Sequence, residues 1–368
     1  MSTPPIYAVI MAGGSGTRFW PASIAKRPKQ FLPISGGLPM IVETFRRLEG
    51  LVDASHVLVV TAASQAELVR EALPELPPAN ILAEPEARNT APCVAWAAYE
   101  IARRDPNAIQ VILPADHVIR PAAEFQETLL AAAEVASAEG TGGGLFTFGI
   151  EPTFPATGYG YIQAAAACGE SRGQTLFGVE RFVEKPNEER AKAFLAEGGF
   201  YWNAGIFVWH TGAILGAIET LTPKLAAGMQ RIMAAADGPE AEATLASEYA
   251  QLDKDPVDVA IMERADDVRL LPISYTWNDV GSWKALEEIS TKDANGNAQV
   301  LSEEGDLIAI DAVNNLVFAE GKRVIALVGV EGLAVVQTDE ATLVCPLDRA
   351  QDVKKIVEQL KAKGGRFL

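Results

Sequence analysis

Residues 6–29 read IYAVIMAGGSGTRFWPASIAKRPK, and this stretch decides the fold. Ile6–Met11 is a short apolar run typical of a buried strand. Three glycines follow it: Gly13, Gly14 and Gly16. Glycine permits backbone conformations that turn several N–H groups toward one point, which suits phosphate oxygens. Four cations come next: Arg18, Lys26, Arg27 and Lys29. A strand, a glycine turn and clustered cations together predict an anion site.

Two common phosphate-binding loops do not fit this spacing. A dinucleotide-binding fingerprint requires a third glycine where Phe19 stands, and a Walker loop requires Gly-Lys-Ser/Thr after four residues. A glycine-rich turn after a strand can also be purely structural, so the loop alone leaves that alternative open. We expect the loop to hold phosphates in a different way from these two motifs.

Strand and helix patterns alternate along the first two-thirds of the chain. The runs with strand character are Ile6–Met11, Val57–Thr61, Ile81–Ala83 and Ile109–Leu113. The helical patterns are Met40–Leu48, Ser64–Leu73, Ala91–Arg104 and Ala122–Ala138. This alternation predicts right-handed βαβ units and a mixed, mostly parallel sheet covered on both faces. We therefore expect an α/β fold whose ligands bind at the carboxyl ends of the strands.

The pattern changes after Phe146 and again after Ser290. The middle part is more mixed, with strands expected at Gly158–Gln163, Gly178–Val183 and Gly205–Trp209 and helices at Glu188–Glu197 and Val259–Arg264. After a turn-rich linker at Asp293–Asn297, the expected elements are short strands at Leu307–Ile310, Leu316–Phe318, Val324–Val328, Leu333–Gln337 and Thr342–Cys345 and a helix at Ala350–Lys361. We expect a catalytic domain over residues 1–290 and a small β-rich domain over residues 291–368. A left-handed β-helix is one form that the small domain can take, and its exposed strand edges favour a homodimer.

The composition is that of an acidic globular protein. The chain has 368 residues, of which 49% are hydrophobic and 21% charged, and its net charge is −17. This acidity argues against nucleic acid and anionic membranes as partners, because both attract a basic surface. Cys93, Cys168 and Cys345 are too few and too widely spaced for a disulfide framework or a zinc cluster. Because neither a signal peptide nor a long apolar span is visible, we expect a cytoplasmic location.

The glycine loop resembles the signature loop of the sugar nucleotidyltransferases, the pyrophosphorylase family. The resemblance rests on the pattern Gly14-x-Gly16-x-Arg18 and on Pro28-Lys29. The variant FWPASIAKRPKQF, residues 19–31, resembles the mannose-1-phosphate guanylyltransferase branch. Six further blocks follow in the family's order: residues 84–92 (EPEARNTAP), 113–117 (LPADH), 158–162 (GYGYI), 183–186 (VEKP), 201–207 (YWNAGIF) and 278–283 (NDVGSW). Chance does not explain a match of so many blocks in the same order.

The resemblance implies a nucleotidyl transfer. In the branch that the chain resembles, GTP and mannose 1-phosphate give GDP-mannose and pyrophosphate. Nucleophile and electrophile are both anions, so catalysis depends on positioning and charge neutralisation. Mg²⁺ held by one or two carboxylates and the substrate phosphates suits this need. The resemblance assigns the metal to Asp116, after an expected strand, and to Asp279, in a turn flanked by glycine and tryptophan.

The resemblance also implies which residues bind the substrates. The triphosphate is assigned to the loop backbone and two catalytic cations: Ala12, Gly13, Gly14, Ser15, Gly16, Thr17, Arg18 and Lys29. Guanine presents donors, so its site needs acceptors, and the block at residues 84–92 is expected to read it at Arg88, Asn89 and Thr90. The sugar phosphate is assigned to Gly158, Tyr159, Glu184, Lys185 and Asn203.

Two alternatives stay open at this point. Another sugar-1-phosphate nucleotidyltransferase would share the loop and the aspartates, although the KRPKQF and RNTAP blocks favour guanine. A non-catalytic regulatory paralogue would bind the nucleotide sugar and control a partner. Such a protein would be expected to have lost one of four residues, Arg18, Lys29, Asp116 or Asp279, and all four are present.

Overall fold

The computed structural model describes residues 4–14, 16–34 and 37–368 and divides into two compact units. The first unit comprises Met1–Gly13, Thr44–Pro114 and Ile119–Trp277. The second comprises Gly14–Glu43, Ala115–Val118 and Asn278–Leu368. The two units differ from the expected domains, whose boundary lies between residues 290 and 291. The second unit also contains the glycine loop.

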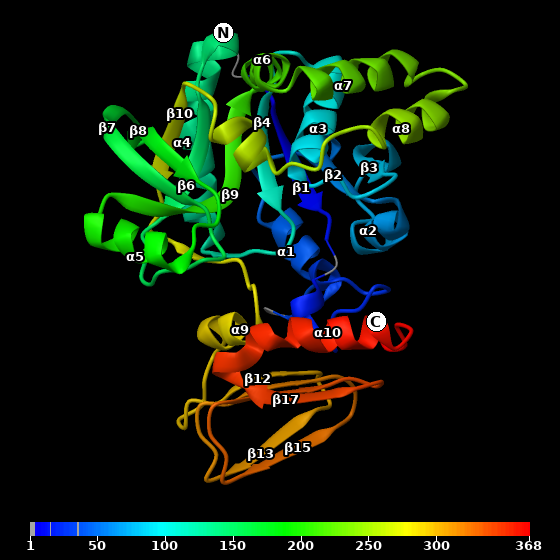
Figure 1. Ribbon diagram of the computed structural model, residues 1–368, viewed down its shortest axis with the longest axis vertical. Coiled ribbons are helices and arrows are strands. Elements are labelled where there is room, and N and C mark those ends of the chain that lie inside the picture. Colours follow the sequence, from blue (N-terminus) through cyan, green and yellow to red (C-terminus); the bar gives the residue numbers. More distant parts are fainter. Residues whose placement is uncertain (1–3, 15, 35–36) are drawn as a thin grey trace. The chain divides into compact units, whose positions relative to one another are not determined.

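A nine-stranded sheet forms the centre of the described part of the first unit, in the order β3-β2-β1-β4-β9-β6-β10-β8-β7 (Figure 1). Its strands are β1 (Ile6–Ala12), β2 (Val57–Ala62), β3 (Ile81–Glu84), β4 (Ile109–Pro114), β6 (Leu145–Ile150), β7 (Tyr161–Ser171), β8 (Gln174–Val183), β9 (Phe200–His210) and β10 (Val268–Pro272). β1 to β4 are parallel, and β6 is parallel to β10. β9 is antiparallel to β4 and β6, and β8 to β10 and β7. Only β8 and β9 therefore run against the common direction in this sheet, which confirms the mixed, mostly parallel arrangement.

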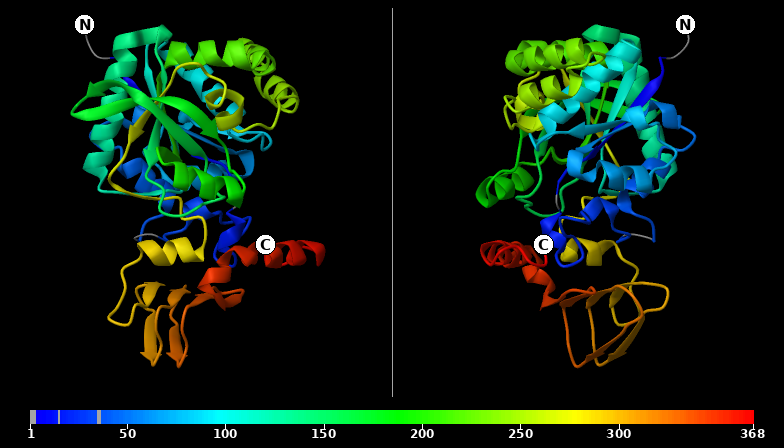
Figure 2. Two further views of the ribbon diagram at one scale, coloured as in Figure 1. Left: turned by 60° about the vertical axis from the view of Figure 1, so that its left-hand side comes forward. Right: turned by 90° about the vertical axis from the view of Figure 1, so that its right-hand side faces the viewer.

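Helices cover both faces of the sheet (Figure 2). α3 (Thr90–Arg104), α6 (Thr211–Leu221) and α7 (Pro223–Ala235) pack together on one face. α4 (Ala122–Glu139) packs against β4 and β9 from the other. The remaining described helices before residue 250 are α1 (Met40–Arg46), α2 (Ala66–Ala72), α5 (Glu188–Glu197) and α8 (Ala241–Tyr249). Among the described helices, none combines the length and the apolar character that a membrane span requires.

Most sequence-based element assignments are confirmed in type, but several bounds differ. β8 begins four residues and β9 five residues before the expected strands, and the expected helix Ala350–Lys361 is divided into a 3₁₀ turn and α10. β7 begins at Tyr161, so the expected strand at Gly158–Gln163 starts three residues too early. The helix expected at Val259–Arg264 is a π-helical turn, η7 (Asp258–Met262). The expected helix Ser64–Leu73 is divided into a short 3₁₀ turn and α2. The 3₁₀ turns are η1 (Thr17–Phe19), η2 (Lys29–Phe31), η3 (Ala54–His56), η4 (Ala63–Gln65), η5 (Pro78–Asn80), η6 (Gly140–Gly142) and η8 (Leu347–Asp352).

The C-terminal strands of the second unit stack as parallel coils. They are β12 (Ala298–Leu301), β13 (Asp306–Ile310), β14 (Leu316–Ala319), β15 (Val324–Val328), β16 (Leu333–Gln337) and an antiparallel last strand, β17 (Thr342–Pro346). Ala298 pairs with Leu316, which pairs with Ala334, so parallel partners lie 18 residues apart. Asp306 and Val324 of β13 and β15 keep the same spacing. The side chains between the coils are aliphatic: Ala312, Val317, Leu327 and Val335. The β-rich C-terminal domain is confirmed.

The glycine loop is anchored to this C-terminal part through tryptophans. Trp283 opens α9 (Trp283–Ile289), and its ring lies 4.7 Å from Phe19 and 5.3 Å from Phe318, centroid to centroid. Its indole N–H donates to the carbonyl oxygen of Trp20 at 3.3 Å. The indole of Trp20 donates to the carbonyl oxygen of Phe367 at 2.9 Å, beyond α10 (Val353–Ala362). Burial of these rings gives the loop a fixed base, which explains why the loop belongs to the second unit.

Candidate active site

A buried lysine joins the two predicted metal-binding aspartates within the second unit. Lys29 is 5% exposed, and its ammonium donates to the carboxylate oxygen Oδ2 of Asp116 at 2.9 Å and to the carbonyl oxygen of the same residue at 3.1 Å. It also donates to the carbonyl oxygen of Asp279 at 2.7 Å. The three donors of the ammonium are therefore used by two residues that are 163 positions apart in sequence. In this arrangement Lys29 positions the aspartates rather than offering a free charge.

The lysine also decides the charge state of Asp116. Burial by itself would raise the pKa of this carboxyl group, but the neighbouring Lys29 ammonium, with His117, outweighs that effect and lowers the pKa. Asp116 thus keeps the negative charge that its predicted metal-binding role requires. In Asp279, Oδ1 accepts the backbone N–H of Gly281 at 3.1 Å. A Cβ on Gly281 would approach Oδ2 of Asp279 to 2.8 Å, so the glycine keeps space beside this carboxylate.

The donor set fits Mg²⁺ bound together with a substrate. Mg²⁺ usually takes one or two protein carboxylates and completes its shell with phosphate oxygens and water. Asp116 and Asp279 are hard oxygen donors of this kind, brought together by one lysine. No cluster of three or more histidine, cysteine or carboxylate ligands occurs among the described residues. Two carboxylates leave the other coordination positions of a metal ion for phosphate oxygens and water.

The glycine loop provides an exposed cation and two left-handed glycines in the second unit. Gly14 has φ +103° and Gly16 has φ +56°. Arg18 follows in η1, where its guanidinium is exposed and makes no hydrogen bond or ion pair to any residue that the structure describes. Arg18 is thus available to an anion, whereas Lys29 is occupied. Thr17 opens the same turn.

The remaining predicted loop residues lie elsewhere. Ala12 and Gly13 belong to the first unit, at the end of β1. The hydroxyl of Thr61 on β2 donates to the carbonyl oxygen of Ala12 at 3.0 Å, which fixes the point where the loop leaves the sheet. Ser15 lies outside the described residues.

A buried carboxylate that was not among the predicted site residues stands where β3 ends, in the first unit. Glu84 is 7% exposed, and its Oε1 accepts the hydroxyl of Tyr249 at 2.5 Å. Its other oxygen, Oε2, lies 3.9 Å from the position that a Cβ on Gly13 would take. Burial raises the pKa of Glu84 to about 7, although the Tyr249 hydroxyl opposes that rise. Glu84 begins the EPEARNTAP block, so its sequence position was the signal for it.

The three residues predicted to read the base hold the surrounding backbone. The Arg88 guanidinium donates to the carbonyl oxygens of Leu252, at 2.8 Å, and of Ala250, just after α8. Asn89 has φ +66° and caps α3 by accepting the N–H of Thr90 at 2.9 Å. The Thr90 hydroxyl accepts the N–H of Val257 at 2.8 Å. These contacts tie the start of α3 to residues 250–257 of the same unit.

The residues predicted to bind the sugar phosphate converge in part, also in the first unit. A Cβ on Gly160 would lie 2.8 Å from Oε2 of Glu184 and 3.3 Å from Cβ of Asn203, so these three positions adjoin. Lys185 pairs with Oε1 of Glu184 and is 61% exposed. Gly158 borders open space, since a Cβ there would meet no described atom within 4 Å. Tyr159 packs edge-on against Trp202, with 5.1 Å between the ring centroids.

Two acidic residues of η7 and its C-terminal end complete this group, and sequence reasoning missed both. Oδ1 of Asp258 accepts the side-chain amide of Asn203 at 2.8 Å. Oε1 of Glu263 accepts the backbone N–H of Glu184 at 2.8 Å. Asp258 directly precedes the helix expected at Val259–Arg264, and Glu263 lies within it, so the sequence indicates only a short helix here. No local pattern signals that the segment contacts residues 184 and 203.

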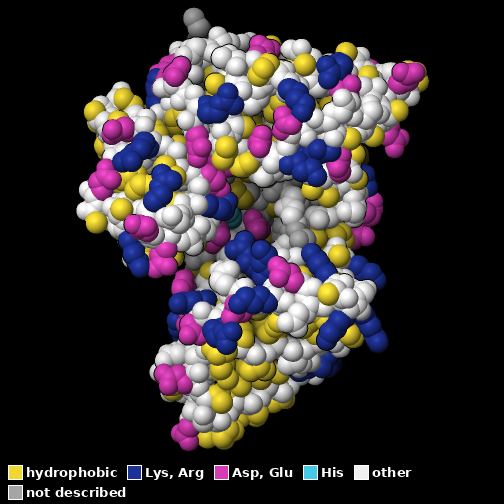
Figure 3. Space-filling view, in the orientation of Figure 1, with side chains coloured by type: hydrophobic (Ala, Val, Ile, Leu, Met, Phe, Trp, Pro, Cys, Tyr) yellow, Lys and Arg dark blue, Asp and Glu magenta, His cyan; other side chains and the backbone are white. Residues whose placement is uncertain are grey.

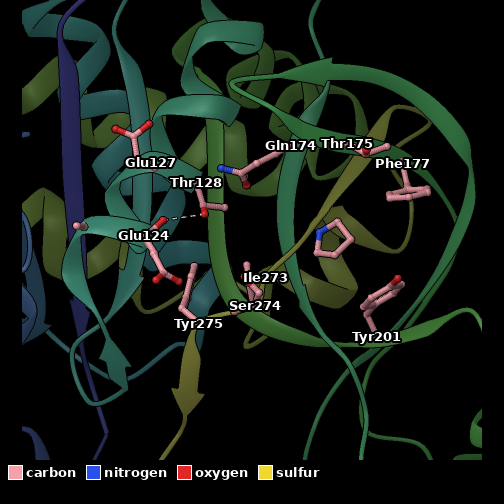
Figure 4. Close-up of a pocket in the computed structure, with 12 residues that line it drawn as sticks. Glu124, Glu127, Thr128, Gln174, Thr175, Phe177, Tyr201, Ile273, Ser274 and Tyr275 are labelled. Atoms are coloured by element: carbon pink, nitrogen blue, oxygen red, sulfur yellow. Dashed lines mark hydrogen bonds between the residues drawn. The ribbon is translucent and has the colours of Figure 1, made fainter.

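One pocket of the first unit has a lining that differs from the candidate site. Its volume is about 670 Å³, and α4, β8, β9 and the segment after β10 line it (Figure 4). The labelled side chains include Glu124, Gln174, Phe177, Tyr201 and Tyr275. None of the predicted site residues that the structure describes is part of its lining.

Comparison with known proteins gives two family matches and several relatives that are similar over nearly the whole chain. The model of the family described as nucleotidyl transferase matches residues 7–296, and one described as MannoseP isomerase/GMP-like beta-helix domain matches residues 305–360. Mannose-1-phosphate guanylyltransferase of Escherichia coli is 40% identical over 99% of this chain and 75% of that protein. Xanthan biosynthesis protein XanB of Xanthomonas campestris is 41% identical over 98% and 74%, respectively. A solved structure described as mannose-1-phosphate geranyltransferase from Thermus thermophilus is 31% identical, with a TM-score of 0.85 over 97% of this chain and 99% of that one.

Proposed function

The chain belongs to the nucleotidyl transferase family, and from that membership we propose that it transfers GMP from GTP to mannose 1-phosphate, releasing GDP-mannose and pyrophosphate. Relatives of about 40% identity bear the name of this activity. The observation that carries the proposal is the joining of Asp116 and Asp279 by the buried ammonium of Lys29. This cluster supplies both the negative charge for a metal and a cation that fixes its geometry.

The reaction needs charge neutralisation more than it needs a protein nucleophile. An oxygen of the sugar phosphate forms a bond to the α-phosphorus of GTP, and the bond from that phosphorus to the β-phosphate oxygen breaks. Pyrophosphate carries away the electron pair. In the proposed mechanism the exposed guanidinium of Arg18 and the loop backbone hold the β- and γ-phosphates. Lys29 acts as a positioning residue for the two aspartates.

The divalent metal in this proposal is Mg²⁺, held by Asp116 and Asp279. When bound, it would neutralise phosphate charge and orient the α-phosphate for in-line attack. The support from this chain is that one lysine contacts the carboxylate of Asp116 and the backbone carbonyl oxygen of Asp279, which brings two residues with hard oxygen donors together. Lys29 keeps both aspartates in place, and Gly281 leaves room beside the carboxylate of Asp279.

Guanine recognition is assigned to Glu84 in this proposal. A carboxylate can accept the N1–H and the exocyclic amine of guanine side by side, which other bases do not offer together. Oε2 of Glu84 faces the first loop glycine, and Tyr249 fixes the other oxygen. Arg88, Asn89 and Thr90 then act by holding the backbone around this carboxylate.

Replacing Glu84 by glutamine should remove the preference for GTP over ITP, whose base lacks the exocyclic amine. We expect the wild type to favour GTP by about tenfold to a hundredfold in kcat/KM, the range that one hydrogen bond to a charged group supplies. In Glu84→Gln that ratio should fall toward one. The rates are measured as pyrophosphate release with each nucleotide at fixed mannose 1-phosphate.

The pH dependence of GTP binding provides the control for the Glu84 assignment. Because the pKa of this buried carboxyl group is about 7, it is protonated below that pH and cannot accept both guanine donors. The Kd for GTP in the wild type should therefore rise by about tenfold per pH unit below 7, relative to Glu84→Gln. Titration of the γ-phosphate affects both proteins equally and cancels. Parallel pH profiles in the two proteins would refute the assignment.

The sugar phosphate is assigned to Glu184, Lys185 and Asn203. The exposed ammonium of Lys185 suits a phosphate, since its single described partner is the neighbouring Glu184. Oε2 of Glu184 remains beside Gly160 as an acceptor for a sugar hydroxyl. In the proposed complex, Gly158 and Tyr159 lie along the path by which the sugar phosphate reaches these three residues.

The proposal includes a homodimer formed through residues 291–368, with catalysis assigned to residues 1–290. Aliphatic side chains stand exposed on the β13–β15 sheet, with Ile308 50%, Ile310 55%, Val324 63% and Val328 66% accessible. Figure 3 shows hydrophobic side chains gathered on this part of the surface. Burial of such a patch would favour self-association. We also propose a cytoplasmic location, which suits the free cysteines Cys93, Cys168 and Cys345.

Ile310→Lys should convert the dimer to a monomer, because it would place a charge in the middle of the apolar patch. Light scattering on the purified protein gives the mass directly. Gln299→Lys, at an exposed position of β12 in the other sheet, is the control with the same change of charge. A monomeric wild type, or a dimer unaffected by Ile310→Lys, would contradict the assignment.

The function itself is tested by pyrophosphate release with mannose 1-phosphate and Mg²⁺, comparing GTP with ATP, UTP and dTTP. We expect release with GTP to exceed release with the other nucleotides by at least about a hundredfold. Preference for a different nucleotide would keep the family but discard guanine. No release with any nucleotide would favour a binding role without turnover.

A further inference from the structure

The orientation of the Asn203 side chain is fixed by its neighbours. Its Oδ1 accepts the backbone N–H of Gly205 at 3.0 Å and the hydroxyl of Thr147 at 3.1 Å. A backbone N–H can only donate, so the oxygen and nitrogen of this amide are assigned without ambiguity. Nδ2 donates one hydrogen to Asp258 at 2.8 Å. Asn203 therefore has one N–H left and no free acceptor, so it can donate to a sugar hydroxyl but cannot accept from one.

The acceptor that Asn203 lacks stands next to it on Asp258. This residue begins the π-helical turn η7, in which the N–H of Glu263 bonds to the carbonyl oxygen of Asp258 at 2.8 Å. Turns of this kind widen a helix and often occur at functional sites. Oδ1 of Asp258 receives the Asn203 amide, which leaves Oδ2 for another donor.

The carboxylate of Asp258 is surrounded by groups that favour the binding of a further hydrogen-bond donor. Burial raises its pKa to about 6, and the negative charge of Glu184 adds to the rise, while its own backbone N–H, Lys185 and Asn203 oppose it. Placing two carboxylates beside the same polar atoms costs free energy unless a ligand donates hydrogen bonds to them. A polyol supplies these hydrogens without adding charge.

Gly160 keeps space open beside this group. A Cβ there would lie 2.8 Å from Oε2 of Glu184 and 3.7 Å from Nδ2 of Asn203. The carbonyl oxygen of Gly160 accepts the N–H of Asn203 at 2.9 Å, which holds the two backbones together. Any larger side chain would fill the space next to the one free donor and the free acceptor of Glu184.

We propose that Asn203 and Asp258 form a fixed donor–acceptor pair that recognises one hydroxyl group of the hexose ring. The remaining N–H of Asn203 donates to the hydroxyl oxygen, and the hydroxyl donates to Oδ2 of Asp258. Glu184 accepts from a different hydroxyl. This inference deepens the proposed function and rests on it, and it makes Asp258 a specificity-determining residue for the sugar. A hydroxyl bound in both directions is discriminated strongly from its absence, because deletion leaves two polar groups unpaired.

The test compares mannose 1-phosphate with its 2-, 3-, 4- and 6-deoxy analogues in the wild type and in Asp258→Asn. The variant keeps the size of the side chain and the acceptor for Asn203, and replaces the free acceptor by a donor. We expect its KM for mannose 1-phosphate to rise by about tenfold to a hundredfold, with KM for GTP within about twofold of the wild type. In the wild type, kcat/KM should fall when the recognised hydroxyl is deleted. In Asp258→Asn the ratio of kcat/KM for mannose 1-phosphate to kcat/KM for that deoxy analogue should approach one, while the ratios for the other analogues stay as in the wild type.

A matched control separates recognition from a general effect of charge. Asp255→Asn removes the same charge from an exposed position three residues earlier, and it should leave KM and the deoxy pattern unchanged. If Asp258→Asn does not fold, as judged by its unfolding temperature, the same panel is run on Asp258→Ser. An unchanged KM, or retention of every deoxy penalty in a folded variant, would overturn the proposal.

Failure of this inference can be told apart from failure of the proposed function. Turnover by the wild type with GTP and mannose 1-phosphate tests the function alone. If the wild type uses a different hexose 1-phosphate, the deoxy series of that hexose is compared in the two proteins. If it turns over none, calorimetric binding of mannose 1-phosphate to the wild type and to Asp258→Asn decides, and equal affinities would overturn the role of Asp258.

Discussion

Asp279→Asn is expected to lower kcat by about a hundredfold to a thousandfold while the protein stays folded, the usual cost of removing one group that stabilises transition-state charge. The substitution is nearly isosteric. The carbonyl oxygen that accepts the Lys29 ammonium belongs to the backbone and is unchanged, and an amide oxygen can still accept the N–H of Gly281. Only the negative charge at the proposed metal site is lost.

The effect is measured as the rate of pyrophosphate release at saturating GTP and mannose 1-phosphate over a range of Mg²⁺ concentrations. Asp266→Asn, which removes the same charge from an exposed loop, serves as the control and should retain full activity. Both variants should unfold at the wild-type temperature. Full activity of Asp279→Asn would remove this residue from the metal site.

Gly16→Ala is expected to cost stability and activity together. Gly16 has φ +56°, and a Cβ there would lie 2.4 Å from Cβ of Lys29 and 2.9 Å from Oγ of Ser23. The left-handed backbone costs about 1–2 kcal/mol and the overlap about 1–3 kcal/mol, so the free energy of unfolding should fall by about 2–5 kcal/mol. Any shift of Lys29 also moves the two aspartates it holds, and we expect kcat to fall by about a hundredfold.

Gly14→Ala is the matched control for this clash. Gly14 has φ +103°, but apart from its chain neighbours no described atom lies within 4 Å of the position that its Cβ would occupy. It therefore carries the backbone strain without the overlap. Denaturant unfolding and pyrophosphate release are measured on both variants. Equal losses in the two would show that Lys29 is not displaced by the substitution at position 16.

The sequence was sufficient to predict the parallel half of the sheet. The strands β1 to β4 are continuous apolar runs bounded by turns and helices, and their observed ends differ from the predicted ones by a residue or less. This is because strands buried on both faces have a distinct composition. The helices α6 to α8, over residues 211–249, were not predicted.

For the C-terminal domain the sequence predicted the short strands, but not the 18-residue repeat that relates successive coils. Asn297 and Asn315, 18 residues apart, are both buried, and the side-chain amide of Asn315 donates to Oδ1 of Asn297 at 3.0 Å. This pair marks equivalent positions in successive coils. A search for repeated positions would have indicated parallel stacking, whereas the strand pattern alone indicated only a β-rich domain.

The candidate site was predictable as a set of residue types but not as a set of contacts. Asp116 and Asp279 were predicted together from family blocks, and they meet on one lysine. Lys29 was predicted to hold phosphate, yet in the structure its three donors go to these aspartates. Asp258 was missed because its contact to Asn203 spans 55 residues and depends on a π-helical turn that no local pattern reveals.

A single incubation of the purified wild-type chain with GTP, mannose 1-phosphate and Mg²⁺, followed by separation of the products, decides whether the proposed reaction takes place. We expect GDP-mannose and pyrophosphate to form in equal amounts, and neither to form when the metal is chelated. Formation of pyrophosphate without GDP-mannose, or no consumption of GTP in the presence of both partners, would contradict the proposed nucleotidyl transfer.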